Sequence, residues 1–355
     1  MADLVEISCS GKDLDALILD AARPEEIAGM LVAALRLDLP TVCVPPSGTP
    51  FYAALVALGL TPVSGELVSI AVEGDEGPRP HELVDNFSLA NALRAGVAAG
   101  CGPELLVHLA ALAREAGVAG FSQMIRVLAP ETPGADPGWL REHGVPGLLA
   151  ALGDALHDVP TVAGNLKVSL PPAPPPPGEH SRLVFVRARA SGAEAVCRVS
   201  MGVTEAAGEC RVFDSEEEAV RAVRAGEVGE ELVIVVGGCG PRGGPGLSRL
   251  DELGRALEET GLEAPVLTDG LAPDDAREPW ISLFTPEAVA GGVLALLRDG
   301  DSLRVDLAEG RIRTGVGVRE FGRREPHEFR DRAGTAYAAR YIQTALPTLE
   351  GAGFG

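Results

Sequence analysis

A run of prolines near the middle of the chain constrains the fold most strongly. Residues 171–177 read PPAPPPP. Consecutive prolines favour the extended polyproline II conformation and act as a stiff spacer. The run therefore predicts a domain over residues 1–170, a linker over residues 171–178 and a second domain over residues 179–355. Each of the two parts has a typical domain length.

The first part alternates short apolar runs with helical patterns. Residues 14–19 and 41–44 are compact apolar runs that predict buried strands. Between them, apolar residues recur at helical spacing over Pro24–Leu37, and Pro24 stands in the favoured first helical position. This order predicts an α/β domain in which helices cover a parallel sheet. Further helices are expected over residues 51–58, 88–99, 104–116 and 147–156.

The second part carries more strand signal. A helix is expected over residues 215–225, where acidic residues fill the first turn and Asp214 or Ser215 can serve as the N-cap. Many strands with few helices predict an α+β domain that resembles a β-barrel. The runs that predict strands are residues 183–190, 195–199, 231–236, 264–267 and 302–306.

The charge balance excludes some partners. The chain has 51 acidic and 30 basic residues, which gives a formal net charge of -21. Such an excess repels a phosphate backbone, so no nucleic acid partner is expected. No apolar run is long enough to span a bilayer, and residues 1–10 lack the basic start of a signal peptide. We therefore expect a cytoplasmic protein without membrane contact.

The cysteines form no recognisable site in the sequence. The chain has six cysteines, and none of them belongs to a CxxC pair. This spacing matches neither a zinc knuckle nor a small secreted disulfide scaffold. Most are expected to be buried small hydrophobic residues. A cluster assembled from distant cysteines stays open as an alternative.

Several segments resemble the family that contains dihydroxy-acid dehydratase and 6-phosphogluconate dehydratase. The similarity is closest in residues 211–246, which include GGCGPRGGPG, and extends to residues 266–292, which begin VLTDG. The resemblance implies a shorter, divergent member of this family. It also implies a homodimer with the former active site between the domains and near the partner subunit. Residues 15–41, 87–118, 298–306 and 334–342 resemble further family segments in the same order.

The resemblance also implies a reaction that needs two kinds of catalyst. In the family, an iron–sulfur cluster assisted by a divalent ion takes the leaving hydroxyl, and a serine removes the proton next to the carboxylate. Hydroxide is a poor leaving group and that proton is weakly acidic, so both a Lewis acid and a base are required.

The positions that align with these parts carry other residues here. The family's cluster motif N/S-C-D-K falls on Arg23, Pro24 and Glu25, its metal-binding glutamate on Arg249 and its catalytic serine on Pro273. A cationic side chain cannot replace a thiolate on iron, and proline cannot act as a base. We therefore predict that the family's [2Fe–2S] cluster and Mg²⁺ are absent.

Other residues with ligand chemistry are expected to be structural. Cys9 and Cys43 are the thiols nearest to the remaining cluster positions, but the surroundings of Cys9 do not match and Cys43 lies on an expected strand. His108 lies inside an apolar helix, where a satisfied core histidine is the expected role.

Polar residues still occupy the loops that align with the family's active site. Their glycines allow turns with exposed N–H groups that suit a carboxylate, with a purely structural turn as the alternative. The helix start at residues 100–104 attracts anions, although Glu104 can simply stabilise its own helix. The candidate substrate-binding residues are Gly100, Gly102, Arg242, Gly243, Gly244 and Gly270. The candidate catalytic residues are Cys101, Glu104, Asp269, Asp274 and Asp275, the last two with an exposed Pro-Asp-Asp turn as the alternative.

Two functions stay open at this stage. The first is a non-catalytic or regulatory homologue, a pseudoenzyme that keeps the scaffold and a pocket for a small carboxylic acid. A variant of it is a partner of an intact dehydratase. The second is a cluster-free lyase of the hydro-lyase type, or an isomerase, that acts on a small hydroxy acid or sugar acid. Whether the chain is an enzyme is therefore left undecided.

Overall fold

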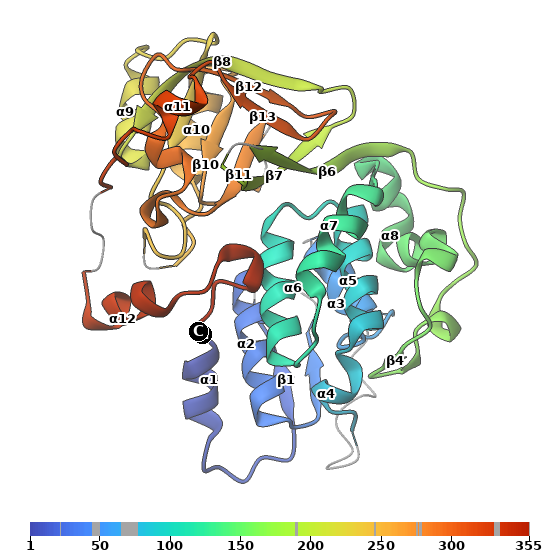
Figure 1. Ribbon diagram of the computed structural model, residues 1–355. Coiled ribbons are helices and arrows are strands. Elements are labelled where there is room, and N and C mark those ends of the chain that lie inside the picture. The colour runs from blue at the N-terminus through green and yellow to red at the C-terminus, as the bar shows by residue number, and fades with distance from the viewer. Residues whose placement is uncertain are drawn as a thin grey trace. The chain divides into compact units, whose positions relative to one another are not determined.

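The computed structural model divides the chain into two compact units, Met1–Arg182 and Leu183–Gly355. It describes residues 1–21, 23–44, 50–64, 77–188, 191–244, 246–274, 276, 279–329 and 334–354. The units are described separately below (Figure 1). The division falls just after the proline run.

The first unit contains a small parallel sheet. Strand β1 (Leu17–Leu19) pairs in parallel with β2 (Thr41–Cys43), and helix α2 (Pro24–Leu37) connects them. The helix has the predicted bounds because Arg23 is extended, Pro24 occupies the first helical position and Asp38 adopts the left-handed conformation at the end. The expected parallel sheet is therefore present as two strands.

Helices make up most of the first unit, and α5 (Asn86–Ala99) lies at their centre. It contacts α3, α6, α7 and α8, and most of its residues are buried. The buried amide of Asn91 donates to the carbonyl of His157 and accepts from its N–H, both at 2.8 Å, so no polar atom of this side chain is left without a bond. The other helices and strands of the unit are α1 (Ala2–Cys9), α3 (Phe51–Ala57), α4 (Pro80–Leu83), α6 (Glu104–Glu115), α7 (Phe121–Glu131), β3 (Gly134–Ala135), α8 (Pro137–Leu152), β4 (Pro160–Thr161) and β5 (Gly164–Asn165).

The second unit is a barrel. Among the described residues, eight strands lie in the order β13-β12-β8-β9-β10-β11-β7-β6, and a pairing of β13 with β6 closes the ring. The sheet is mixed: β8, β9, β10 and β11 run parallel, and the other neighbours are mostly antiparallel. The expected barrel is confirmed. Its strands are β6 (Glu179–Ala188), β7 (Ala193–Ser200), β8 (Glu205–Phe213), β9 (Leu232–Val236), β10 (Val266–Thr268), β11 (Trp280–Thr285), β12 (Ser302–Asp306) and β13 (Arg311–Thr314).

Strand β9 shows how the barrel separates two apolar cores. Val233 and Val235 belong to the core that fills the barrel, whereas Ile234 and Val236 belong to the core beneath the helices. The alternation follows from the two-residue period of a strand. The covering helices are α9 (Glu216–Arg224), which Ser215 caps, and α10 (Asp251–Thr260). Helices α11 (Val318–Phe321) and α12 (Ala336–Thr344) follow the last strand.

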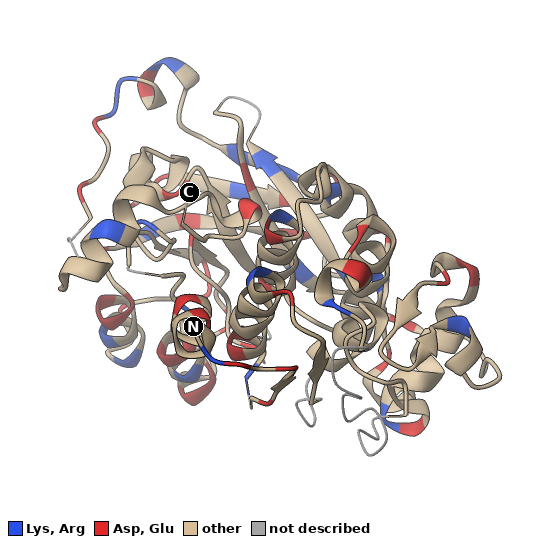
Figure 2. Ribbon diagram, turned by 90° about the horizontal axis from the view of Figure 1, so that it is seen from below, with Lys and Arg blue, Asp and Glu red and all other residues tan. Residues whose placement is uncertain are grey.

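Charged positions are spread over the fold. Figure 2 shows acidic residues on helices and loops throughout the view, with basic residues among them. Within the described part of the chain, no helix is both long and apolar enough to cross a membrane. Five of the six cysteines are buried, as expected, and Cys9 is partly exposed.

Candidate functional site

The glycine-rich loop of the second unit lies at one end of the barrel. It begins after Val236, the last residue of β9, and ends before Asp251, the first residue of α10. Because β9, β10 and β11 run parallel, the segments that follow all three strands meet at the same end. In α/β sheets and barrels, ligands commonly bind beyond the carboxyl ends of parallel strands.

Asp269 follows β10 directly and is fully buried. Its carboxyl oxygens accept hydrogen bonds from the N–H groups of Gly238 at 3.2 Å, Cys239 at 2.8 Å and Ala288 at 2.8 Å. Burial raises the pKa of this carboxyl, and the three N–H donors act in the opposite direction. Asp269 therefore joins the loop to the segment that follows β11.

Glu287 follows β11 and is the acid that the sequence did not single out. The residue is 5% exposed, and its Oε2 accepts the N–H of Arg242 at 2.8 Å. Its pKa is raised to about 7, mainly by burial and also by the nearby charge of Asp269, while the N–H groups of Arg242 and Gly243 and the charge of Arg242 act in the opposite direction. A Cβ at Gly240 would lie 2.5 Å from Oε2, so a glycine leaves room for the carboxyl group. In the sequence, Glu287 stands between Pro286 and small residues, and nothing local indicates that it is buried or that it binds the loop.

The predicted substrate-binding glycines use their N–H groups within the chain. The N–H groups of Gly243 and Gly244 each donate to the carbonyl of Gly240 at 3.1 Å. The N–H of Gly270 donates to the hydroxyl of Thr268 at 3.0 Å. The exposed Arg242 side chain donates through Nε to the carbonyl of Ala345 at 3.2 Å. That these residues bind a substrate stays a prediction, and the site already holds two carboxyl groups of the protein.

The structure brings Arg249 and Asp274 together. The Arg249 guanidinium pairs with the Asp274 carboxylate and also donates to the carbonyl of Ala272 at 3.3 Å. Pro273 packs on α10, where a Cβ at Gly254 would lie 2.5 Å from its Cγ. The position that aligns with the family's metal ligand is thus ion-paired with the residue that follows Pro273, the position of the family's base. Asp275 lies outside the described residues.

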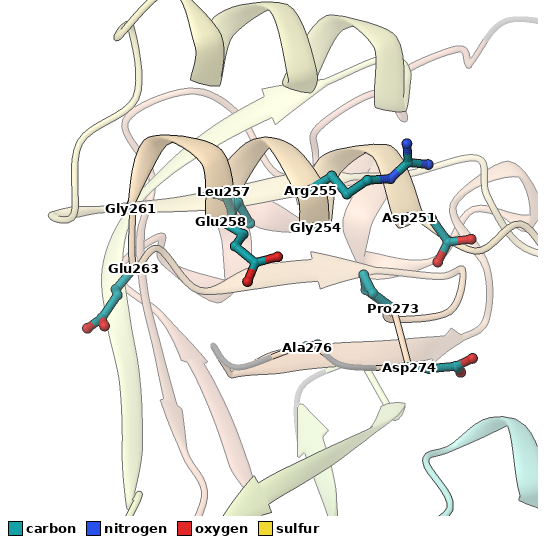
Figure 3. Close-up of a pocket in the computed structure, with 10 residues that line it drawn as sticks. All are labelled: Asp251, Gly254, Arg255, Leu257, Glu258, Gly261, Glu263, Pro273, Asp274 and Ala276. Atoms are coloured by element: carbon teal, nitrogen blue, oxygen red, sulfur yellow. The ribbon is translucent and has the colours of Figure 1, made fainter. Parts of the chain in front are cut away.

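A hollow of about 580 Å³ lies between α10 and the loop after β10. Figure 3 shows Pro273 and Asp274 on the loop and Asp251 on the helix at the same end of it. Four of its lining side chains are carboxylates, and their negative charge disfavours the binding of an anion in the hollow. The residues that line it are Asp251, Gly254, Arg255, Leu257, Glu258, Gly261, Glu263, Pro273, Asp274 and Ala276.

The turn at residues 100–104 belongs to the first unit. Gly100 ends α5 in the left-handed conformation, with φ of 102°, and Cys101 is buried. The N–H of Gly102 donates to Oε1 of Glu104 at 2.8 Å. Glu104 is the first residue of α6, so its carboxylate lies at the positive end of its own helix. On the same helix, the His108 ring makes an edge contact with Phe51.

The start of α2 offers no thiolate at the position of the cluster motif. Arg23 forms ion pairs with Glu26 at 2.6 Å and with Glu25 at 3.5 Å. Cys43 is fully buried on β2, and burial raises the pKa of its thiol. Among the described residues, no three or more His, Cys, Asp and Glu side chains form a group that could hold a metal ion.

The chain is similar to one family model and to individual proteins of known name. The family model described as "Dihydroxy-acid/6-phosphogluconate dehydratase C-terminal" matches residues 176–352. Dihydroxy-acid dehydratase of Carboxydothermus hydrogenoformans is 27% identical over 92% of this chain and 77% of its own length. Dihydroxy-acid dehydratase 2 of Bordetella bronchiseptica is 29% identical over 91% of this chain and 74% of its own. The similarity to dihydroxy-acid dehydratase of Citrifermentans bemidjiense, at 31% identity, covers 74% of this chain but 52% of the relative.

Proposed function

The chain belongs to the dihydroxy-acid/6-phosphogluconate dehydratase family, and we propose that it binds a small hydroxy acid or sugar acid without carrying out the family's cluster-dependent dehydration. It is a shorter and divergent member, at modest identity to its relatives. In this proposal the protein is a non-catalytic or regulatory homologue, and it forms a homodimer.

The residues at the family's cluster position do not fit an iron–sulfur cluster. Arg23 is a cation that two glutamates already neutralise, and Pro24 has no ligand atom. The buried thiol of Cys43 resists the deprotonation that iron binding requires, because burial raises its pKa. Nor does Arg249, a cation, suit a divalent ion. The proposal therefore includes the absence of both groups and routes no reaction step through them.

The ion pair between Arg249 and Asp274 is the observation that carries the proposal. Arg249 stands where the family has a metal-binding carboxylate, so a cation occupies the place of a cation's ligand. Asp274 is the described acid next to Pro273, which stands where the family has its serine base. The Asp274 carboxylate pairs with the Arg249 guanidinium, so the two replaced positions lie beside one ion pair.

A small carboxylic acid is the ligand class that the inherited loops favour. The turn at Gly102 and the loop at residues 238–242 both direct N–H groups at carboxylates, although those carboxylates belong to Glu104, Asp269 and Glu287. A ligand would compete most readily for the turn at Gly102, where the carboxylate comes from a side chain two residues away.

Reconstitution tests the loss of the family reaction. The purified protein would be treated anaerobically with iron and sulfide, and then assayed with a short 2,3-dihydroxy acid and with 6-phosphogluconate. We expect no cluster absorption and no dehydration. A brown protein that dehydrates either compound would overturn the proposal.

Titration calorimetry tests ligand binding. The same two acids would be titrated into the untreated protein, with a diol of matching size that lacks the carboxylate as a control. We expect binding of an acid and none of the diol.

Light scattering tests the proposed homodimer. The purified protein should give twice the chain mass of 36.7 kDa.

A cluster-free lyase or isomerase is the second candidate. It is favoured by Glu287, a buried carboxyl group whose pKa is raised to about 7, because a carboxyl group that is protonated near neutral pH is a suitable general acid. Alanine substitutions at Cys101, Glu104, Asp269 and Asp274, together with Glu287→Gln, would be compared in any assay that detects turnover. Full activity in all five variants would remove this candidate.

A further inference from the structure

Two buried carboxyl groups hold one loop at the end of the barrel. Asp269 accepts the N–H groups of Gly238 and Cys239, and Glu287 accepts the N–H of Arg242. Asp269 also accepts the N–H of Ala288, the residue next to Glu287. The two side chains therefore fix neighbouring parts of the loop and are linked to each other through one peptide group.

The charges around Glu287 do not allow both acids to ionise without cost. Among the described residues, the titratable and charged groups that act on or respond to Glu287 are Asp269 from the end of β10, Arg242 from the loop and Tyr341 from α12. Arg242 is exposed, and its Nε is bound to the carbonyl of Ala345. Its positive charge is therefore largely screened by water, whereas both carboxyl groups are buried and the charge of Asp269 acts on Glu287.

Asp269 is the better place for the single negative charge. Three N–H groups point at its oxygens, and each of them stabilises the ionised form. Glu287 lies close to the loop backbone at Gly240. A Cβ at that position would lie 2.5 Å from Oε2, so only a glycine leaves room for the carboxyl group. A proton on Glu287 leaves one oxygen to accept the Arg242 N–H and removes the repulsion from Asp269.

We propose that Glu287 is a positioning residue that keeps one proton for the Asp269–Glu287 pair and holds residues 240–244 in place while that proton is bound. Loss of the proton adds a second buried negative charge and loosens the loop. If the proposed acid ligand binds this loop, its affinity falls as the proton is lost. That last step rests on the proposed function, whereas the behaviour of the loop does not.

The sign follows from the direction of the shift. The folded protein binds the Glu287 proton more tightly than the unfolded chain does, because the pKa is raised to about 7 in the fold. The stabilisation is complete below the ordinary glutamate value of about 4.3 and is lost as the pH rises through about 7. The loop should therefore be most ordered at acidic pH and least ordered above neutrality.

Amide hydrogen exchange of the ligand-free protein tests the proposal. Protection of the N–H groups of Arg242, Gly243 and Gly244 would be measured from about pH 5 to about pH 8 and corrected for the intrinsic pH dependence of exchange. We expect wild-type protection to fall by about tenfold to a hundredfold over this range. In Glu287→Gln, which keeps the shape and cannot ionise, protection should stay level. Glu230→Gln, at an exposed glutamate of the same unit, should behave as wild type.

Two outcomes would overturn the proposal. One is level protection in the wild-type protein, and the other is a fall of equal size in Glu287→Gln. Should that variant fail to fold, a carboxyl-carbon NMR titration of the wild type decides. A carboxyl group that titrates near neutrality is expected, and its absence would contradict the proposal. Because no ligand is present, failure here is distinct from failure of the proposed acid binding.

Discussion

The turn at Gly102 and the glycine-rich loop of the barrel differ in where the carboxyl group that accepts their N–H groups comes from. Each offers backbone N–H groups to an anion, and in each a carboxyl group of the chain accepts them. At Gly102 the carboxylate belongs to Glu104, two residues away at the start of a helix. At the barrel loop it belongs to Asp269 and Glu287, which are buried and at least 30 residues away. The first is a local cap, and the second is part of the core.

This difference predicts which turn can change without loss of the fold. A local cap can be displaced by a ligand at little cost. A buried acid that joins three segments cannot be displaced without leaving several N–H groups without acceptors. Substitutions in the two turns should therefore differ in cost.

The largest effect is expected for Asp269→Ala. The variant leaves the N–H groups of Gly238, Cys239 and Ala288 buried without this acceptor. We expect the free energy of unfolding to fall by about 3–5 kcal/mol, measured by urea denaturation. A loss below about 1 kcal/mol would remove the distinction between the two turns.

A matched pair of glycine substitutions gives the next largest difference. In Gly243→Ala the new Cβ would lie 2.6 Å from the backbone of Gly238, whereas in Gly102→Ala it would meet the flexible carboxylate of Glu104 at 2.5 Å. We expect a loss of about 1–3 kcal/mol for the first and about 0.5 kcal/mol for the second. Gly317→Ala has no atom nearby and serves as the control in thermal denaturation. Equal losses at Gly243 and Gly102 would contradict the comparison.

Glu104→Ala should cost less than Gly243→Ala but change ligand binding more. Loss of a carboxylate from the first turn of α6 should lower the free energy of unfolding by about 0.5–1 kcal/mol. The Gly102 N–H is then open to an acid in solution, so calorimetry should show tighter binding of the acid that the wild type binds. Glu104→Gln is the control for size. Unchanged affinity in both variants would place the ligand elsewhere.

The smallest effect is expected for Arg249→Ala. The Asp274 side chain is 79% exposed, so water screens the ion pair. We expect a loss of about 0.2–1 kcal/mol, which a double substitution cycle with Asp274→Ala would measure. A coupling of several kcal/mol would mean that this pair closes the loop firmly and would give it a structural role as large as that of Asp269.

Local signals in the sequence predicted local structure well. Pro24 marks the start of α2, and Ser215 caps α9 as one of two expected caps. Strand β1 is shorter than expected because its preceding residues have no partner strand in the described part of the chain. The helix expected over residues 147–156 begins at Pro137, and non-helical Gly144 divides it. The glycine interrupts the helical spacing of apolar residues, so the pattern did not show that the helix begins before it.

Contacts between distant residues could not be predicted in the same way. The strands β8, β11 and β13 were not expected, although they are necessary for a closed ring. Asp269 was expected as a candidate acid, but its three N–H donors come from segments that only the fold brings together. Glu287 was missed for the same reason. The pairing of Arg249 with Asp274 likewise depends on the bridge between Arg249 and Leu271.

The closure of the barrel between β6 and β13 has a consequence for synthesis on the ribosome. Arg187 near the start of the barrel pairs with Arg311 near its end, so the ring cannot form until almost the whole second unit has left the exit tunnel. At a typical elongation rate the first strand waits roughly 10 s for its neighbour. During that interval its unpaired edge is open to other nascent chains. The order of translation, and not only stability, therefore sets how safely this protein reaches its native state.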